Sequence, residues 1–285
     1  MRKAALVVCG PTASGKSDLS DNLAERLSDR EGRYIPTLAI DSMQVYRELP
    51  VITNQARRRP AELVGVVSVT EEWTVARHRM RAEEIIAREN IFVLDAGTGM
   101  YSNAMLLDLP LAPRVSPSLR RQAQEAAANE SNPRRAARAK ELELAGAEVR
   151  GSIWQGNLCY DTSIVYLRPE RSTVDAAIEG RSKRIARDGL GEAERLRDLA
   201  AAGARISPQV MESVGVRELS RHLSGTLTLQ QAQDLIATRT RRLARRQMRW
   251  FDKLARILEG RARITVLHDQ YRITDLHSMH DIIGL

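Results

Sequence analysis

The chain has 285 residues, enough for one large domain with its own hydrophobic core, and its two cysteines, Cys9 and Cys159, stand in no metal-ligand spacing. No stretch approaches the roughly 18 apolar residues that span a bilayer, so we expect a soluble protein of the reducing cytoplasm without membrane contact. The formal net charge of +8, from 44 Lys and Arg against 36 Asp and Glu, suits a polyanionic partner, although a solvated arginine-rich surface would explain the composition equally well.

Strands and helices are predicted to alternate through most of the chain. The segment GPTASGKS, residues 10–17, fits G-x-x-x-x-G-K-[ST], a phosphate-binding loop that lies between a strand and a helix. Apolar periodicity predicts, in chain order, a strand at 3–8, a helix at 17–30, a strand at 34–40, a helix at 74–88, a strand at 91–94, a strand at 160–167 and helices at 172–187 and 228–259. This order predicts an α/β fold, namely a P-loop NTPase-like parallel sheet flanked by helices.

Three prolines, Pro110, Pro113 and Pro117, interrupt this alternation. The residues after them are rich in Ala, Arg, Glu and Gln and keep a weak apolar stripe, which predicts a small all-helical insertion rather than a disordered linker. We therefore divide the chain into the first part of a P-loop core at 1–111, a short helical insertion at 112–157, and the completion of the core with a C-terminal basic helix at 158–285.

The last long helix is the most clearly patterned element. Thr228 opens it with the capping box T-x-x-Q, and S-x-x-D at Ser172 predicts a similar cap for the helix at 172–187. Basic residues recur three or four apart along the late helix, at Arg242, Arg245, Arg246, Arg249, Lys253 and Arg256. Like charges at this spacing repel, so we interpret this row, called the basic ridge below, as a polyanion-binding surface, with a solvated helix face as the alternative.

Three polar segments follow predicted strands: the phosphate loop, Asp41, and the run from Asp95 to Gly99. Because ligands bind at the carboxyl ends of parallel strands, we expect these segments to line one crevice. Lys16 is expected to neutralise a phosphate and Ser17 to bind Mg²⁺, with Asp95 as a second candidate metal ligand at a Walker-B position. A carboxylate at position 41 suits either a general base or a helix N-cap.

Four motifs in series resemble those of the tRNA dimethylallyltransferases, also called isopentenyltransferases. They are GPTASGKS at 10–17, DSMQVYRELP at 41–50, DAGTGMY at 95–101 and TRRLARRQMRWF at 240–251. The resemblance covers roughly residues 4 to 257. It implies transfer of a dimethylallyl group from dimethylallyl diphosphate to the exocyclic N6 amine of adenosine, with tRNA as the partner and the adenosine next to the anticodon as the acceptor.

The resemblance also implies roles for individual residues. Lys16, Asp41 and Thr98 would be catalytic, with Asp41 as the base that deprotonates the adenine amine. The diphosphate would be bound by Gly10, Thr12, Ala13, Ser14, Gly15, Lys16 and Ser17, with Mg²⁺ on Ser17. The acceptor or its tRNA would be bound by Ser42, Met43, Gln44, Arg134, Arg135, Arg138, Arg241, Arg245, Arg246 and Gln247. The zinc finger of the eukaryotic members is absent, so we expect no zinc.

Two departures from the family pattern leave the acceptor open. The expected pair of histidines is replaced by the run from Val64 to Ser68, and the insertion is some twenty to thirty residues short. These changes favour a second interpretation, prenylation of a free adenine nucleotide such as AMP, ADP or ATP. A third, a P-loop small-molecule kinase, depends only on the loop and on Asp95. The sequence leaves the oligomeric state open, with a monomer favoured.

Overall fold

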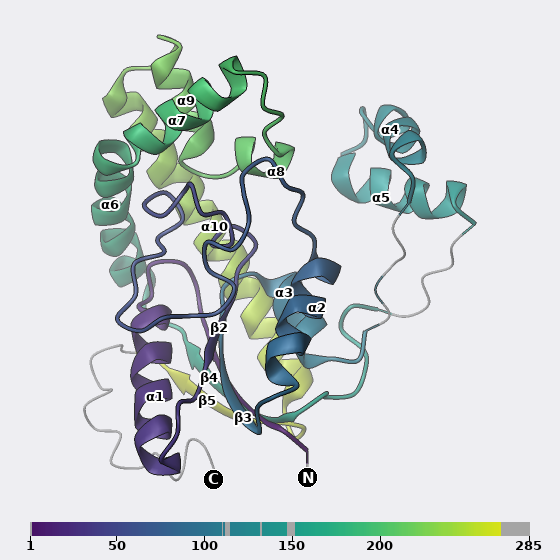
Figure 1. The fold of residues 1–285 in the computed structure, drawn as a ribbon, viewed down its shortest axis with the longest axis vertical. Coiled ribbons are helices and arrows are strands. Elements are labelled where there is room, and N and C mark those ends of the chain that lie inside the picture. Colours follow the sequence, from purple (N-terminus) through teal and green to yellow (C-terminus); the bar gives the residue numbers. More distant parts are fainter. Residues whose placement is uncertain (1, 110, 112–114, 132, 147–151, 269–285) are drawn as a thin grey trace. The chain divides into compact units, whose positions relative to one another are not determined.

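The structure is a computed structural model that describes residues 2–109, 111, 115–131, 133–146 and 152–268 (Figure 1). Its five strands are β1 (Ala4–Cys9), β2 (Thr37–Ile40), β3 (Ile91–Ala96), β4 (Asp161–Leu167) and β5 (Arg263–Leu267). Its helices are α1 (Lys16–Glu31), α2 (Val75–Ile86), α3 (Gly99–Leu106), α4 (Pro117–Ala126), α5 (Pro133–Leu144), α6 (Arg171–Asp188), α7 (Leu190–Ala201), α8 (Pro208–Met211), α9 (Val216–Leu223) and α10 (Leu229–Leu258).

The strands form one parallel sheet in the order β2-β3-β1-β4-β5. Strands β1 and β3 are nearly continuous runs of apolar residues, as expected when helices cover both faces of a sheet. β1 lies in the middle, between β3 and β4, so its carboxyl end opens beside the ends of both neighbours. The predicted α/β fold is confirmed.

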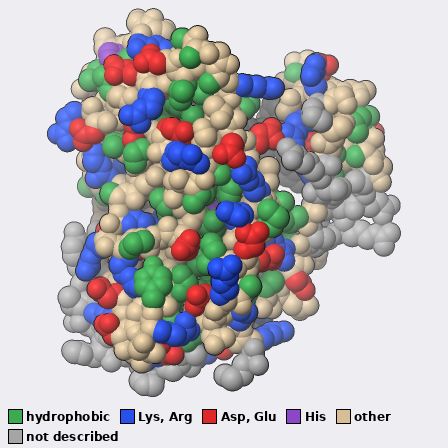
Figure 2. Space-filling model, viewed as in Figure 1, with side chains coloured by type: hydrophobic (Ala, Val, Ile, Leu, Met, Phe, Trp, Pro, Cys, Tyr) green, Lys and Arg blue, Asp and Glu red, His purple; other side chains and the backbone are tan. Residues whose placement is uncertain are grey.

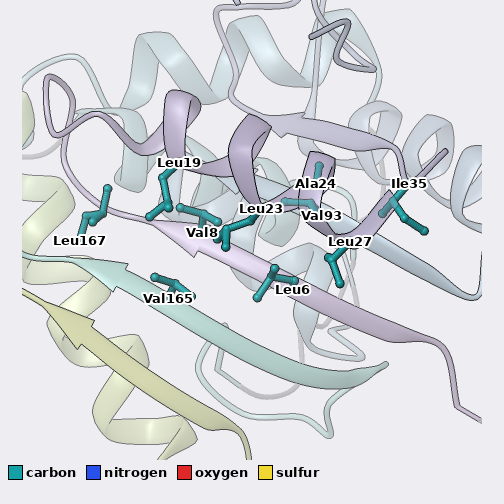
Figure 3. Close-up of a cluster of buried hydrophobic side chains, with 10 residues drawn as sticks. All are labelled: Leu6, Val8, Leu19, Leu23, Ala24, Leu27, Ile35, Val93, Val165 and Leu167. Carbon is teal, nitrogen blue, oxygen red and sulfur yellow. The ribbon is translucent and has the colours of Figure 1, made fainter. Parts of the chain in front are cut away.

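Helices α1 and α10 cover opposite faces of the sheet. The leucines of α1, at 19, 23 and 27, pack against Val8, Val93 and Val165 from the three central strands (Figure 3). Successive residues of a strand point to opposite faces, and Tyr166 accordingly packs its ring 6.1 Å from that of Phe251 on α10. The sheet is therefore packed between α1 on one face and α10 on the other.

The structure differs from the sequence expectations in one helix cap and in several elements that apolar periodicity did not predict. The predicted S-x-x-D cap at Ser172 is wrong, because α6 begins at Arg171 and its N-cap residue Glu170 makes no side-chain cap bond. The capping box at Thr228 is confirmed. Helix α3 and strand β5 were not predicted: α3 is buried over most of its length and shows no polar face, and β5 is a short, half-exposed edge strand.

The chain separates into two compact units. One contains residues 1–106 and 158–285 and holds the whole sheet, and the other contains residues 107–157 with α4 and α5. The ends of the larger unit meet directly, since the N–H of Cys159 donates to the carbonyl of Leu106 at 2.9 Å. Within the residues that are described, no helix is both long enough and apolar enough to cross a membrane.

Candidate active site

The phosphate loop joins the end of β1 to the start of α1, whose first residue is Lys16. The N–H of Ser14 donates to the carbonyl of Pro11 at 3.3 Å and closes a turn in the loop. Ala13, inside this turn, has a φ of 66°, a left-handed conformation that is uncommon for a residue with a Cβ. Ser14 is buried, and its Oγ has no partner among the described residues. Buried hydroxyls are normally bonded, so this oxygen suits a ligand that binds in the loop.

Asp95, at the end of β3, lies beside the loop because β3 is paired with β1. Ser17 donates from Oγ to Asp95 Oδ2 at 2.7 Å, and Lys16 Nζ forms an ion pair with Asp95 Oδ1 at 3.3 Å. The carboxylate is 1% exposed. The structure therefore brings the two candidate metal ligands, Ser17 and Asp95, together with the loop lysine that is expected to bind phosphate.

Arg57 completes a buried charge network around Asp95. Its Nη1 and Nη2 donate to Asp95 Oδ2 at 2.7 and 2.8 Å, and its Nε lies 3.4 Å from Asp21 Oδ1. Burial alone would raise the pKa of Asp95, but the charges of Lys16 and Arg57, with hydrogen bonds from Ser17 and Lys16, outweigh it and hold this pKa below its usual value. Neither Arg57 nor Asp21 was predicted from the sequence, since Arg57 lies in a run of three arginines, which is more often a solvated surface.

Asp41 directly follows β2 and has its two carboxylate oxygens in different surroundings. Oδ1 accepts hydrogen bonds from the N–H groups of Met43 at 2.8 Å and Gln44 at 3.4 Å. Oδ2 accepts none from the described residues and faces Gly97. One oxygen thus fixes the side chain, as in an N-cap, while the other is available for a proton. The two interpretations of Asp41 from the sequence are compatible.

Gly97 allows Asp41 and Lys16 to approach the same point. A Cβ at position 97 would lie 2.7 Å from Asp41 Oδ2, 3.2 Å from Lys16 Cε and 3.5 Å from Lys16 Nζ. Any side chain here would push the candidate base and the loop lysine away from the turn. The absence of a side chain therefore lets a carboxylate and a phosphate-loop cation meet in one crevice, as the strand-end argument predicted.

Thr98 and the segment from Ser42 to Gln44 face each other across this turn. The N–H of Ser42 donates to Thr98 Oγ1 at 3.1 Å, and Gln209 of α8 donates from Nε2 to the carbonyl of Ser42 at 3.2 Å. Gln44 is 5% exposed, and its Oε1 has no hydrogen-bond partner in the described part of the chain. A buried amide oxygen without a hydrogen-bond partner is suited to accept a hydrogen bond from an N–H group of a bound substrate.

Arg181 on α6 is a second cation near Asp41 that sequence analysis missed. Burial lowers the pKa of Arg181 to about 10, and the negative charge of Asp41 partly offsets this decrease. The group is still a cation at neutral pH. Its signal lies in the helical spacing, because Val174, Ile178 and Ile185 are buried and Arg181 occupies the same stripe. An arginine on an apolar helix stripe indicates a charged partner nearby.

All six side chains of the basic ridge, Arg242, Arg245, Arg246, Arg249, Lys253 and Arg256, are exposed. Arg241, beside them, forms ion pairs with Asp175 and Glu179 of α6 instead. On the face of the molecule drawn in Figure 2, Lys and Arg are interspersed with Asp and Glu and form no separate basic area. The ridge on α10 is a concentration of positive charge along one helix, which a formal net charge of +8 alone does not reveal.

The remaining predicted tRNA contacts lie in different settings. Gln247 is buried, and both ends of its amide are bonded to backbone groups of the phosphate loop and of Gly97. Arg138 of α5 forms an ion pair with Glu141 at 2.5 Å. The side chains of Arg134 and Arg135 lie outside the part of the chain that is described. Across the described residues, no three His, Cys, Asp or Glu side chains are grouped to hold a metal ion.

Comparisons with known proteins show the family to which the chain belongs. The family model described as IPP transferase matches residues 44–254. A tRNA dimethylallyltransferase of Rubrobacter xylanophilus is 60% identical over the full length of both chains, and the tRNA dimethylallyltransferase 1 of Citrifermentans bemidjiense is 33% identical over 87% of this chain and 89% of its own.

Two solved structures are similar to the fold. The tRNA isopentenylpyrophosphate transferase of Bacillus halodurans has a TM-score of 0.69 at 25% identity, covering 97% of this chain and 95% of its own. A eukaryotic dimethylallyltransferase acting on tRNA has a TM-score of 0.70 at 21% identity, covering 95% of this chain and 76% of its own. The match of the family model to most of the sequence, together with a full-length relative at 60% identity, leads to one conclusion: the chain belongs to the IPP transferase family.

Proposed function

We propose that this protein transfers the dimethylallyl group of dimethylallyl diphosphate to the N6 amine of an adenosine in tRNA, at the position next to the anticodon. The observation that carries the proposal is the meeting of Asp41 Oδ2 and Lys16 at Gly97, because prenyl transfer needs a base and a diphosphate-binding cation side by side. A relative with 60% identity over its full length bears the name tRNA dimethylallyltransferase. With tRNA as its substrate, the protein would act in the cytoplasm.

The phosphate loop binds the donor and stabilises its leaving group. As the bond between the allylic carbon and oxygen breaks, negative charge grows on the diphosphate, and Lys16, the loop N–H groups and Arg181 are available to stabilise it. Gly10, Thr12, Ala13, Ser14 and Gly15 form the loop around it. Ser14 Oγ is buried and has no hydrogen-bond partner among the described residues, so its hydroxyl can donate to a diphosphate oxygen.

Mg²⁺ fits this site by the chemistry of its donors. Ser17 Oγ and Asp95 Oδ2 lie 2.7 Å apart, and a hydroxyl and a carboxylate, together with diphosphate oxygens, form the hard oxygen set that Mg²⁺ prefers. Ser17 would hold the ion, with Asp95 as its neighbour. When bound, the ion would neutralise part of the diphosphate charge. Arg57 also occupies Asp95 Oδ2, so the carboxylate has a cationic partner of its own.

Asp41 removes the proton from the attacking amine. The N6 nitrogen of adenine is a weak base, but it becomes acidic as it forms the new bond to carbon, so a nearby carboxylate is sufficient to accept its proton. Met43 and Gln44 hold Asp41 Oδ1 from behind and leave Oδ2 toward the crevice. Thr98 and Ser42 are bonded to each other beside it, where they can orient the adenine.

The two alternatives from the sequence have less support than a tRNA acceptor. The short insertion favoured a free nucleotide acceptor, but the relative named tRNA dimethylallyltransferase matches this chain over 100% of both lengths and therefore shares the short insertion. Asp95 favoured a kinase, but its carboxylate is bonded to Arg57 in a buried pair that needs no ATP to explain it. The basic ridge on α10 suits the phosphate backbone of tRNA.

The direct test supplies both candidate acceptors to the same enzyme. Labelled dimethylallyl diphosphate is incubated with the protein and either unmodified tRNA or AMP, in the presence of Mg²⁺. We expect label in tRNA, at an adenosine, and none in AMP. Label in AMP but never in tRNA would overturn the acceptor, and ATP turnover without prenyl transfer would overturn the reaction.

A further inference from the structure

The side chain of Gln247 makes two hydrogen bonds that join distant parts of the site. Its Oε1 accepts the N–H of Thr12 at 2.8 Å, and its Nε2 donates to the carbonyl of Gly97 at 2.8 Å. Gln247 is buried on the side of α10 that also buries Ala244, Phe251 and Leu254. A polar side chain at a buried position of a helix costs free energy unless both ends of its amide are bonded, and here both are.

The two groups that Gln247 binds belong to the two halves of the reaction. Thr12 lies in the phosphate loop, directly before Ala13 with its left-handed φ of 66°. A residue with a Cβ keeps this conformation only where its surroundings fix the backbone, and the bond from the Thr12 N–H is one such restraint. Gly97 lies between Asp41 and Lys16, and it is followed by Thr98, so its carbonyl belongs to the acceptor side.

The Gly97 turn is also held from the sheet. The N–H groups of Gly97 and Thr98 both donate to the carbonyl of Ile40, at 3.1 and 3.0 Å. The turn is therefore anchored to the end of β2, next to Asp41, and Gln247 connects this anchored turn to the loop. Without the amide, the loop would keep its own internal turn but lose its direct hydrogen bond through Gln247 to the Gly97 turn.

We propose that Gln247 is a positioning residue that sets the phosphate loop and the Gly97 turn at the spacing required for transfer, and that it does not contact tRNA. This inference rests on the proposed function. It separates Gln247 from its neighbours Arg245 and Arg246, which are exposed on the ridge. It also means that the N–H of Thr12 serves the loop conformation and is not free for the diphosphate.

The chemistry of the two bonds requires a neutral amide. A glutamate would keep an acceptor for the Thr12 N–H but would place a second acceptor against the Gly97 carbonyl, where two oxygens repel. A methionine would fill a similar volume and make neither bond. The variants Gln247→Glu and Gln247→Met therefore separate loss of one bond from loss of both. The matched control is Arg246→Met, which changes an exposed residue of the same helical turn.

The experiment uses the full chain and measures binding of each substrate separately. Equilibrium titration gives the Kd for inorganic diphosphate with Mg²⁺ and the Kd for unmodified tRNA, and steady-state assays give KM for each substrate. We expect both Gln247 variants to raise the Kd for diphosphate and the KM for dimethylallyl diphosphate about tenfold, as for a buried hydrogen bond lost, with the Kd for tRNA unchanged. Arg246→Met should raise the Kd for tRNA and leave the Kd for diphosphate unchanged.

Two outcomes would overturn the proposal. Weaker tRNA binding with unchanged diphosphate binding in the Gln247 variants would make this residue a tRNA contact, and unchanged values for both would leave it no role in the site. Circular dichroism and thermal unfolding check that each variant is folded, and Gln247→Met, which conserves volume, tests the inference if Gln247→Glu unfolds. The Kd for diphosphate is measured without prenyl transfer. A wild-type protein that binds diphosphate but never prenylates tRNA would therefore contradict the proposed function, while the effect of the Gln247 variants on diphosphate binding could still be measured.

Discussion

In the proposed mechanism, Asp41 has two tasks, which are divided between its two carboxylate oxygens. Oδ1 is fixed by the N–H groups of Met43 and Gln44, and Oδ2 faces the crevice at Gly97. Asp41→Asn keeps an oxygen that can accept both N–H groups and removes only the base. We expect the transfer rate to fall by about 10²–10⁴-fold, the typical contribution of a positioned general base. The Kd for dimethylallyl diphosphate should stay the same or decrease, because a negative charge near the diphosphate is lost.

The measurement is single-turnover transfer to tRNA, with diphosphate binding measured in parallel. Asp161→Asn, which changes an exposed carboxylate at the start of β4, is the control and should leave both values unchanged. An Asp41→Asn variant that keeps more than a tenth of the wild-type rate would show that the proton leaves by another route. The general-base role would then be wrong.

Asp95 is a stability residue as well as a candidate metal neighbour. Its carboxylate is 1% exposed and its partner Arg57 is 5% exposed. Removing the negative charge of Asp95 therefore takes an ion-pair partner from two buried cations, Arg57 and Lys16. We expect Asp95→Asn to lower the free energy of unfolding at pH 7 by about 3–5 kcal/mol, the usual cost of breaking a buried pair. The matched surface change, Asp161→Asn, breaks an exposed pair with Arg263 and should cost at most about 1 kcal/mol.

The pH dependence of this cost follows from the pKa of Asp95. Because the folded-state pKa lies below its usual value, the carboxylate stabilises the fold above the unfolded-state pKa of about 3.9, and this contribution is lost as the pH falls through the folded-state pKa. Denaturant unfolding of the wild type and of Asp95→Asn should therefore show a difference in the free energy of unfolding that shrinks only in this acid range. A difference that stays constant to the lowest pH at which both fold would contradict the ionised pair.

Helix α10 serves the protein through two faces with different chemistry. One face buries apolar residues and Gln247 against the site, and Trp250 donates from Nε1 to Asn103 Oδ1 of α3 at 3.0 Å. The ring of Trp250 packs so closely on Gly99 that a Cβ there would lie 2.4 Å from it. The other face carries the basic ridge. A single rigid helix thus connects the proposed tRNA surface to the reacting groups.

The basic ridge predicts a strong salt dependence of tRNA binding. We expect Arg245→Gln and Arg246→Gln each to reduce the slope of log Kd against log salt concentration by about 1, because each phosphate contact releases close to one counterion. Diphosphate binding should not change. Arg30→Gln, at the far end of α1 from the loop, is the control and should leave the slope as it is.

The titration is run with unmodified tRNA from about 50 to 200 mM salt, a range over which phosphate contacts change affinity strongly. If neither ridge variant alters the slope, the ridge is a solvated helix face. Arg241 offers a graded comparison, because it is already paired with Asp175 and Glu179 and should contribute less than its neighbours.

At the scale of the whole molecule, the fold could be predicted because the loop motif and apolar periodicity agree along the chain. Runs such as Ala4–Cys9 are continuous and apolar, and the motif predicts a loop and a helix directly after this strand. Asp41, Lys16 and Asp95 could be placed together because each follows or ends a strand of one parallel sheet. The short half-exposed strand β5 and the buried helix α3 show no comparable periodicity.

The parts of the site that could not be predicted depend on long-range packing. Arg57, Arg181 and Gln209 reach the site from segments without a strand-end motif, and only the folded chain brings them to Asp95, Asp41 and Ser42. Gln247 was expected to contact tRNA because the family resemblance assigns its segment of the late helix to tRNA binding. Sequence spacing puts it beside the ridge, but helical geometry turns it to the buried face, about 100° from its neighbour.

The division into two units makes a prediction about excision of the smaller one. The sheet, the phosphate loop, Asp41 and Gln247 all belong to the unit formed by residues 1–106 and 158–285, whose ends meet at the bond between Leu106 and Cys159. Replacing residues 107–157 by a short Gly-Ser linker should therefore leave a folded protein that unfolds cooperatively and binds diphosphate with Mg²⁺ as the full chain does.

The same excision should weaken tRNA binding, because α5 carries Arg138 and the other arginines that the resemblance assigns to tRNA. We expect the Kd for unmodified tRNA to rise by about tenfold or more, equivalent to about 1.4 kcal/mol, measured beside the Kd for diphosphate on the same preparation. A full chain with Arg138→Gln is the control for the charge alone and should lose less than the excision. If the excised protein binds tRNA as tightly as the full chain, the ridge on α10 supplies the contact with tRNA by itself, and residues 107–157 serve another purpose.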